Sequence, residues 1–247
     1  MRLIYFSLFS FFTFSCETTE PVDTNAPLDR AQQIVDQAIE QHGGDAYNNL
    51  ELSYTFRKRR YQLQNKNGEY TYTRTQEKNG QQIVDEMTAN RFQRTIDGAI
   101  IELSDSLSQV YANAVNSVNY FVQLPYRLND EAVQKKYIGG TTIKNKRYEV
   151  VEVTFSKEGG GDDFDDQYYY WFDAETAQLD YLTYSFHVNE GGVRFRAAIN
   201  QRRVKGIIVQ DYLNYKAPKE TPLADLPQLY ESGELELLST IATENPR

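Results

Sequence analysis

The chain has 247 residues, a formal net charge of −9, 19 tyrosines and a single cysteine. One cysteine excludes an intramolecular disulfide and a site built from several thiolates. Without disulfides, we expect a domain stabilised by its hydrophobic core. The acidic balance argues against a nucleic-acid partner and against a basic patch that docks on anionic lipid.

The N-terminus has the pattern of a membrane-targeting segment. Arg2 precedes an apolar stretch over residues 3–14, and Ser15 then precedes the only cysteine, Cys16. The stretch is shorter than the about 20 residues that a spanning helix needs. It resembles a bacterial lipoprotein signal peptide, which is cleaved before a lipid-modified cysteine. The resemblance implies that residues 1–15 are removed and that Cys16 carries acyl chains such as palmitate, which attach the protein to a membrane. An ordinary secretory signal and an uncleaved anchor are the alternatives.

Order is expected to begin after a tether. Residues 16–27 are polar, include two prolines and show no periodicity, which favours a flexible lipidated tether. We expect residues 28–247 to form a single half-barrel-like domain. Its first element is an amphipathic helix, because apolar residues recur at helical spacing until Gly43-Gly44 ends the pattern. These residues are Leu28, Ala31, Ile34, Val35, Ala38 and Ile39.

The period then changes from 3.6 to 2. Strands are predicted at residues 50–56, 70–75, 82–87, 91–96 and 99–103, separated by turns such as Asn67-Gly68, Asn79-Gly80 and Asp97-Gly98. A second helix is predicted after Ser104, with one face formed by Leu107, Val110, Tyr111, Ala114, Val118 and Phe121. Leu124-Pro125-Tyr126 ends this helix.

Alternation returns after a connecting stretch, at residues 147–155, 167–172, 178–187, 193–203 and 207–215. Nine or ten closely spaced strands with two helices predict a mainly β (α+β) fold. We expect a curved antiparallel sheet or partial β-barrel with an N-terminal helix and an inserted central helix. The apolar segment at residues 235–241 is interpreted as a covering segment.

Few residues suggest catalytic chemistry. The Gly-rich acidic loop contains Asp162, Asp163, Asp165 and Asp166, which could coordinate Ca²⁺ through oxygen ligands or could simply be a solvated hairpin tip. His42 precedes the glycines that end the first helix, where an imidazolium would interact favourably with the helix C-terminus. His187 lies two residues after Ser185 but outside any hydrolase signature. No cofactor is expected.

The candidate ligand-binding residues are aromatic and basic. Arg194 and Arg196 share one face of a strand, where they could hold a carboxylate or phosphate, pair with the acidic loop, or remain solvated. In the aromatic run at residues 168–172, alternation sends Tyr169 and Trp171 to one face of the strand. The candidate set is Tyr111, Phe121, Tyr169, Trp171, Arg194 and Arg196. Core packing is the alternative for its aromatic members.

Two resemblances extend this interpretation. The order of helix, meander, internal helix and further strands resembles the half-barrel of the lipoprotein-carrier and lipoprotein-receptor proteins of the bacterial outer membrane. Four motifs in the second half of the chain look more specifically like an uncharacterised family of Bacteroidota lipoproteins, a resemblance that covers roughly residues 31–215. They are Tyr170-Trp171-Phe172-Asp173, Leu179-Asp180-Tyr181-Leu182-Thr183-Tyr184, Gly191-Gly192-Val193-Arg194-Phe195-Arg196 and Lys205-Gly206-Ile207. The resemblance implies an envelope location and a barrel-like domain.

Three functions follow as hypotheses. The first is a non-enzymatic, monomeric envelope lipoprotein, anchored in the outer membrane and facing either the periplasm or the surface. Its curved sheet would bind a lipid, an acylated molecule or another hydrophobic ligand. The second is a hydrolase that uses the acidic loop with His187 or Arg196. The third is a surface module that recognises protein or polysaccharide through exposed Tyr168 and Tyr170.

Overall fold

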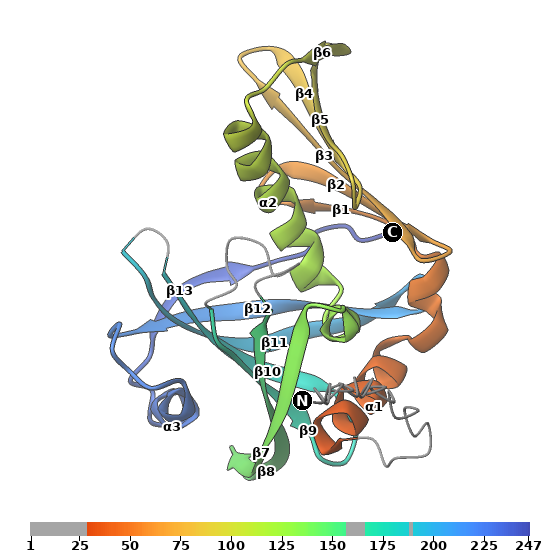
Figure 1. Ribbon diagram of the computed structural model, residues 1–247. Coiled ribbons are helices and arrows are strands. Elements are labelled where there is room, and N and C mark those ends of the chain that lie inside the picture. Colours follow the sequence, from red (N-terminus) through yellow and green to blue (C-terminus); the bar gives the residue numbers. More distant parts are fainter. Residues whose placement is uncertain (1–28, 157–165, 188–189) are drawn as a thin grey trace, which may run out of the picture.

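A computed structural model describes residues 29–156, 166–187 and 190–247 of the chain (Figure 1). The predicted signal peptide, Cys16, the tether and three of the four acidic-loop aspartates, Asp162, Asp163 and Asp165, lie outside the described residues. Within the described part, the predicted fold class is confirmed, since antiparallel strands dominate and two longer helices pack on them.

The first sheet is a six-stranded meander in which each strand pairs with the next along the chain. Tight turns with residues at positive φ, such as Asn67 at 53° and Asn79 at 54°, connect the strands as the Asn-Gly signals predicted. The strands are β1 (Glu51–Phe56), β2 (Arg59–Lys66), β3 (Glu69–Lys78), β4 (Gln81–Met87), β5 (Phe92–Ile96) and β6 (Ala99–Ile101).

The second sheet has seven strands, in the order β13-β12-β11-β10-β9-β8-β7, and is also antiparallel throughout. Its strands are β7 (Val133–Ile143), β8 (Lys146–Phe155), β9 (Tyr168–Asp173), β10 (Leu179–Phe186), β11 (Gly192–Val204), β12 (Ile207–Ala217) and β13 (Glu236–Ile241).

In the described ranges, three α-helices cover these sheets (Figure 1). Helix α1 (Arg30–His42) lies against β7 and β8, and α3 (Leu226–Ser232) covers the opposite face of the second sheet. Helix α2 (Asp105–Val122) runs along the first sheet, over β3, β4 and β5, and its C-terminal end reaches the second sheet. Short 3₁₀ segments follow α1 and α2 and precede α3: η1 (Gly44–Asn49), η2 (Tyr126–Asn129) and η3 (Leu223–Asp225). No helix in the described ranges is long and apolar enough to cross a membrane.

The C-terminal residues connect the two sheets. Strand β13 pairs with β12, and the chain then continues along the edge of the first sheet, where Thr55 and Glu244 exchange backbone hydrogen bonds of 2.8 and 2.9 Å. Ser53 and Arg247 exchange a second pair of 2.9 and 3.0 Å. The last residues therefore hold the first edge strand, β1, beside the second sheet.

The hydrophobic core follows the sheet faces. One cluster joins α1 to Tyr168, Tyr170 and Phe172 on the inner face of the second sheet, and another fills the space between the first sheet and α2. On the outer face, Trp171 packs in a third group and α3 covers a fourth. The predicted alternation of the aromatic run is therefore present in β9.

Several element predictions need correction. Strands β2 and β7 were missed, because β2 has only two apolar residues, Tyr61 and Leu63, among exposed polar ones and β7 is interrupted by Gly139-Gly140. Leu107 and Val110, assigned to the buried face of α2, are 46 % and 59 % exposed because that turn of the helix extends past the core. Residues 235–241, interpreted as a covering segment, contain β13, while α3 does the covering.

Candidate binding site between the sheets

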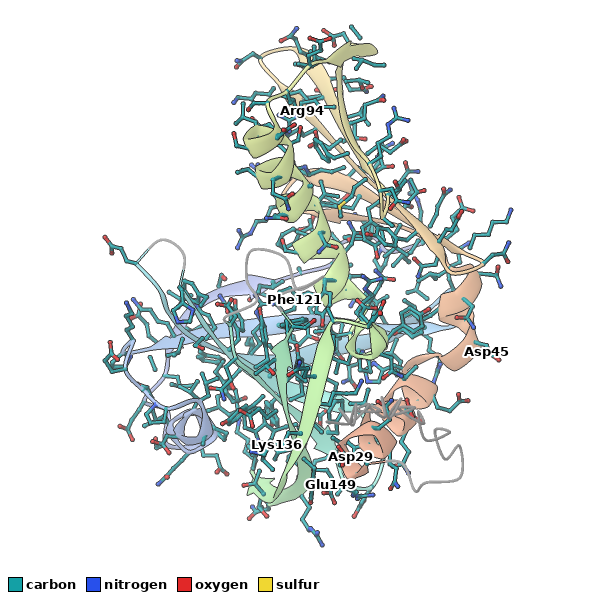
Figure 2. All side chains as sticks on the ribbon, in the orientation of Figure 1. Asp29, Asp45, Arg94, Phe121, Lys136 and Glu149 are labelled. Carbon is teal, nitrogen blue, oxygen red and sulfur yellow. The ribbon has the colours of Figure 1, made fainter. Side chains whose placement is uncertain are left out.

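A cavity of about 220 Å³ lies where the C-terminal half of α2 meets the inner face of the second sheet. The turn after β1 and the residues that follow β13 complete its walls. Its apolar wall is formed by Phe56, Val118, Phe121, Val122 and Ile241. Polar atoms come from Arg57, Ser117, Arg196, Gln210, Tyr212 and Thr243. Figure 2 labels Phe121 at the end of α2 that faces the second sheet. Arg57 and Ser117 are exposed, so they mark the mouth of the cavity.

Arg196 is the charged residue inside this cavity. It lies on β11, where Val193, Phe195 and Ala197 point to the outer core and Arg196 points inward by alternation. Only 9 % of the residue is exposed, and its guanidinium carbon lies 4.1 Å from the centre of the Phe121 ring. Its Nη2 donates a 2.9 Å hydrogen bond to the Tyr184 hydroxyl, whereas Nε has no partner among the described residues. None of the ion pairs among the described residues includes Arg196.

Neutral polar groups stand beside the guanidinium. The Gln210 side chain donates to the Tyr212 hydroxyl at 2.6 Å and to the Leu179 carbonyl at 3.2 Å, which fixes its orientation. Burial raises the pKa of Tyr212 to about 12, with smaller lowering effects from Gln210 and Arg196. Tyr212 is therefore a neutral hydroxyl at pH 7, and Arg196 carries the charge in this part of the site.

The structure divides the six predicted ligand residues among four places. Phe121 and Arg196 line the cavity together, whereas Tyr169 and Trp171 line a hollow of about 440 Å³ on the outer face, beside α3. Tyr111 lies toward the other end of α2, with the Arg94 guanidinium 3.4 Å above its ring, a region labelled by Arg94 in Figure 2.

The last of the six, Arg194, does share a strand face with Arg196. However, its guanidinium packs over the Phe186 ring at 4.7 Å and donates to the Val193 carbonyl at 2.8 Å. It is not among the residues that line the cavity. The two arginines therefore do not form a joint anion site.

Within the described residues, the two histidines and Asp166 form no assembled catalytic group. His187 is 69 % exposed at its side chain and its Nδ1 lies 3.3 Å from a carboxylate oxygen of Asp166, which is buried. Across the described ranges, no group of three or more His, Cys, Asp or Glu could hold a metal ion. Tyr168 and Tyr170 are 9 % and 0 % exposed, so the exposed tyrosine groove required by the third hypothesis is absent at these two residues.

His42 is structural, but not as an imidazolium. Burial, with a smaller effect of Arg203, lowers its pKa from 6.5 to about 4, and the ring is neutral at pH 7. Its Nε2 accepts a 3.1 Å hydrogen bond from the backbone N–H of Leu179. The helix-terminus interpretation was wrong because β10 buries the ring completely, a contact between residues 137 positions apart.

Sequence reasoning missed Phe56, Gln210, Tyr212 and Ile241 as cavity residues. Phe56 and Ile241 end their strands as ordinary apolar positions, and nothing in their local sequence distinguishes them from core residues. Gln210 offers a weak signal, since it is a polar residue within the otherwise apolar start of β12 and is only 8 % exposed.

Comparison with known sequences identifies a family. The family model described as "Family of unknown function (DUF6503)" matches residues 9–243. No curated protein matches the chain. The prediction of an uncharacterised family agrees with this description, while the Bacteroidota source stays a prediction.

Solved structures resemble the chain at the level of architecture. A LolA superfamily protein from Nitrosomonas europaea has 14 % identity and a TM-score of 0.47, with 77 % of this chain and 87 % of that chain covered. A DUF1329 family protein from Desulfovibrio piger has 10 % identity and a TM-score of 0.40, with coverages of 85 % and 100 %. A putative outer membrane lipoprotein-sorting protein domain from Vibrio parahaemolyticus has 8 % identity and a TM-score of 0.40, with coverages of 74 % and 86 %. Similarity at this level supports no inference about ligand or activity.

Proposed function

Because the chain belongs to the DUF6503 family, whose description assigns no activity, we propose a function from its own residues: it is a non-enzymatic, lipid-anchored envelope protein that binds a hydrophobic ligand between its two sheets. The observation that carries this proposal is the cavity at the end of α2, with five apolar side chains on its wall. Small-molecule sites are typically concave, mostly apolar and supplied with a few fixed polar groups. The Gln210 and Tyr212 pair, whose hydrogen bonds hold it in place, meets the last condition.

The size of the cavity limits the ligand. An apolar cavity of about 150 Å³ is enough to hold benzene, so the about 220 Å³ observed here has room for a short chain or a small ring. Pockets that bind drug-sized ligands have volumes of about 300 to 1,000 Å³, larger than this cavity. A long lipid would therefore place only one end in the cavity and extend through the mouth beside Arg57 and Ser117.

The membrane attachment rests on the sequence alone. Cleavage after Ser15 and acylation of Cys16 would hold the domain at the outer membrane through a tether of about ten residues. Two or more acyl chains are needed for stable anchoring, because each buried CH₂ contributes only about 0.8 kcal/mol. Residues 16–247 carrying Cys16→Ser, exported behind an ordinary cleavable secretory signal, should appear in the soluble fraction, whereas the wild-type chain should be in the membrane fraction. Mass spectrometry of the wild-type N-terminal peptide should show the acyl mass. An unmodified, soluble wild-type chain would refute the anchor.

Ligand binding can be tested with the predicted mature chain, residues 16–247, carrying Cys16→Ser and called the Cys16→Ser chain below. It lacks both the acyl chains and the apolar residues 3–14, which would otherwise bind the probe. N-phenylnaphthylamine, a neutral fluorescent probe of apolar sites, should bind and gain fluorescence. Val118→Trp fills the cavity from α2 and should abolish the signal. Val110→Trp is the matched control, since Val110 lies on the same helix but is 59 % exposed and outside the cavity.

The outcomes separate the cavity from non-specific surface binding. Loss of binding in Val118→Trp alone supports the proposal, provided that circular dichroism shows both variants folded. Equal binding by both variants, or no binding by the parent chain, refutes it. If Val118→Trp does not fold, Ile241→Trp tests the opposite wall of the cavity.

A further inference from the structure

The residues that line the cavity between the sheets are positively charged, in contrast to the acidic protein as a whole. The whole protein carries a net charge of −9. The described residues that line the cavity nevertheless include two arginines and no aspartate or glutamate. Arg57 is exposed at the mouth and Arg196 is buried inside. The site is therefore positive within an acidic protein, which favours the entry and retention of an anion.

Of the two arginines that line the cavity, the buried Arg196 is the stronger evidence for an anionic ligand. A guanidinium stays protonated in proteins, so burial cannot neutralise it as it would neutralise a lysine. A buried charge needs a partner, because its desolvation is expensive. The described residues supply one hydroxyl, from Tyr184, and the faces of the Phe121 and Tyr184 rings at 4.1 and 5.1 Å. They supply no carboxylate, and Nε remains without an acceptor.

A comparison with the first sheet shows how this chain otherwise treats buried arginines. Arg74 and Arg94 flank Asp85 on neighbouring strands, and the carboxylate accepts from both at 2.6 to 3.0 Å. Each of these arginines is buried to a similar degree as Arg196. Arg196 lacks the equivalent partner within the described residues, and it lines the cavity between the sheets.

From this arrangement we infer that the ligand of the cavity is an amphiphile with a carboxylate head, which pairs with the Arg196 guanidinium while its apolar chain lies along Phe121, Val118 and Val122. The inference rests on the proposed function and specifies the ligand class. A carboxylate fits because it is planar and accepts parallel N–H donors from a guanidinium. The cavity size selects a short chain, or the carboxylate end of a longer one.

The neighbouring groups suit this orientation. Tyr212 lines the same cavity as Arg196, and the positive charge of Arg196 lowers the pKa of both Tyr170 and Tyr212 against the larger raising effect of burial. Burial raises the pKa of Tyr170 well above its usual value, and the neutral hydroxyl has no hydrogen-bond partner in the described part of the chain. The hydroxyl of Tyr212, which lines the cavity, would add to the attraction of Arg196 for a carboxylate.

The test compares octanoate with octanol, which share a chain and differ in the head group. Each competes with N-phenylnaphthylamine for the Cys16→Ser chain at pH 7. Octanoate should bind about tenfold to a hundredfold more tightly than octanol, as one charge-assisted hydrogen-bonded pair implies. Arg196→Gln should remove this preference while the neutral probe still binds. Arg194→Gln is the matched control on the same strand face, and it should keep the preference.

Each outcome decides a different point. Equal affinity for octanoate and octanol, or a preference that survives Arg196→Gln, overturns the carboxylate inference and leaves hydrophobic binding intact. Failure of the neutral probe to bind overturns the proposed function itself. If Arg196→Gln does not fold, Arg196→Lys keeps the positive charge but loses the planar fork, and it should reduce the octanoate preference without abolishing it. An unchanged preference in folded Arg196→Lys contradicts pairing through the guanidinium fork.

Discussion

The buried neutral histidine predicts a specific pH dependence of stability. His42 is 0 % exposed and burial lowers its pKa from 6.5 to about 4. Between these two values the unfolded chain holds a proton on this residue and the folded chain does not. The contribution of His42 to stability is therefore complete above pH 6.5 and decreases as the pH falls toward 4.

The size of this effect follows from the gap between the two pKa values. At about 1.4 kcal/mol per pH unit, the gap corresponds to about 3 kcal/mol of unfolding free energy lost on acidification. This is a substantial share of the about 5 to 15 kcal/mol that stabilises an ordinary domain. The hydrogen bond from Leu179 N–H to Nε2 is lost with it, because a protonated ring has no acceptor.

His42→Gln keeps an acceptor but does not titrate. Urea unfolding of the Cys16→Ser chain, followed by circular dichroism at pH 4, 5, 6 and 7, should give a flatter stability profile for His42→Gln than for the parent. His187→Gln removes the only other histidine, whose side chain is 69 % exposed, and serves as the control. An unchanged slope in His42→Gln, or an equal flattening in His187→Gln, would refute the assignment of this pH dependence to His42.

Two further predictions concern the first sheet. Asp85→Ala leaves Arg74 and Arg94 buried without their shared carboxylate and should reduce the unfolding free energy by about 3 to 5 kcal/mol. Urea unfolding measures this loss. Glu86→Ala, which changes the exposed neighbour of Asp85 on β4, is the control and should change the unfolding free energy by no more than about 0.5 kcal/mol. A loss below about 1 kcal/mol in Asp85→Ala would contradict the stabilising role of the Asp85 carboxylate between the two arginines. Deleting residues 244–247 removes four backbone hydrogen bonds to Ser53 and Thr55, with an expected loss of about 2 to 5 kcal/mol. Hydrogen exchange should then accelerate at the Ser53 and Thr55 amides. The Ile83 amide, in a strand distant from that edge, is the control and should not change. Unchanged protection at β1 would show that the C-terminus does not hold the edge strand.

The local sequence predicted most elements because their signals are local. Helical spacing of apolar residues and Gly43-Gly44 placed α1, which ends at His42, and the Asn-Gly turns placed the hairpins of the first sheet. Strand β7 escaped because strong alternation requires one clearly apolar face, whereas Ile138 at its centre is 40 % exposed beside Gly139 and Gly140. Its existence depends on pairing with β8.

The residues of the candidate site could not be predicted from local sequence patterns alone. Alternation alone put Arg194 and Arg196 on one face, and the structure agrees, yet only Arg196 reaches the cavity. The difference comes from what packs above each side chain: Phe186 lies under Arg194, whereas the end of α2 brings Phe121 over Arg196. No spacing along β11 encodes the position of a helix more than 70 residues earlier in the chain.

The sequence by itself determined the class of the fold, most of its helices and strands, and the pattern that predicts a lipidated Cys16, since composition, periodicity and a contiguous signal need no knowledge of distant contacts. Only the tertiary structure decided which buried groups meet. It made His42 a neutral acceptor for β10, joined the C-terminus to β1, and enclosed Arg196 with Phe121 and Tyr212 in one cavity. These are long-range contacts, and their energies depend on burial and partners that exist only after the chain has folded.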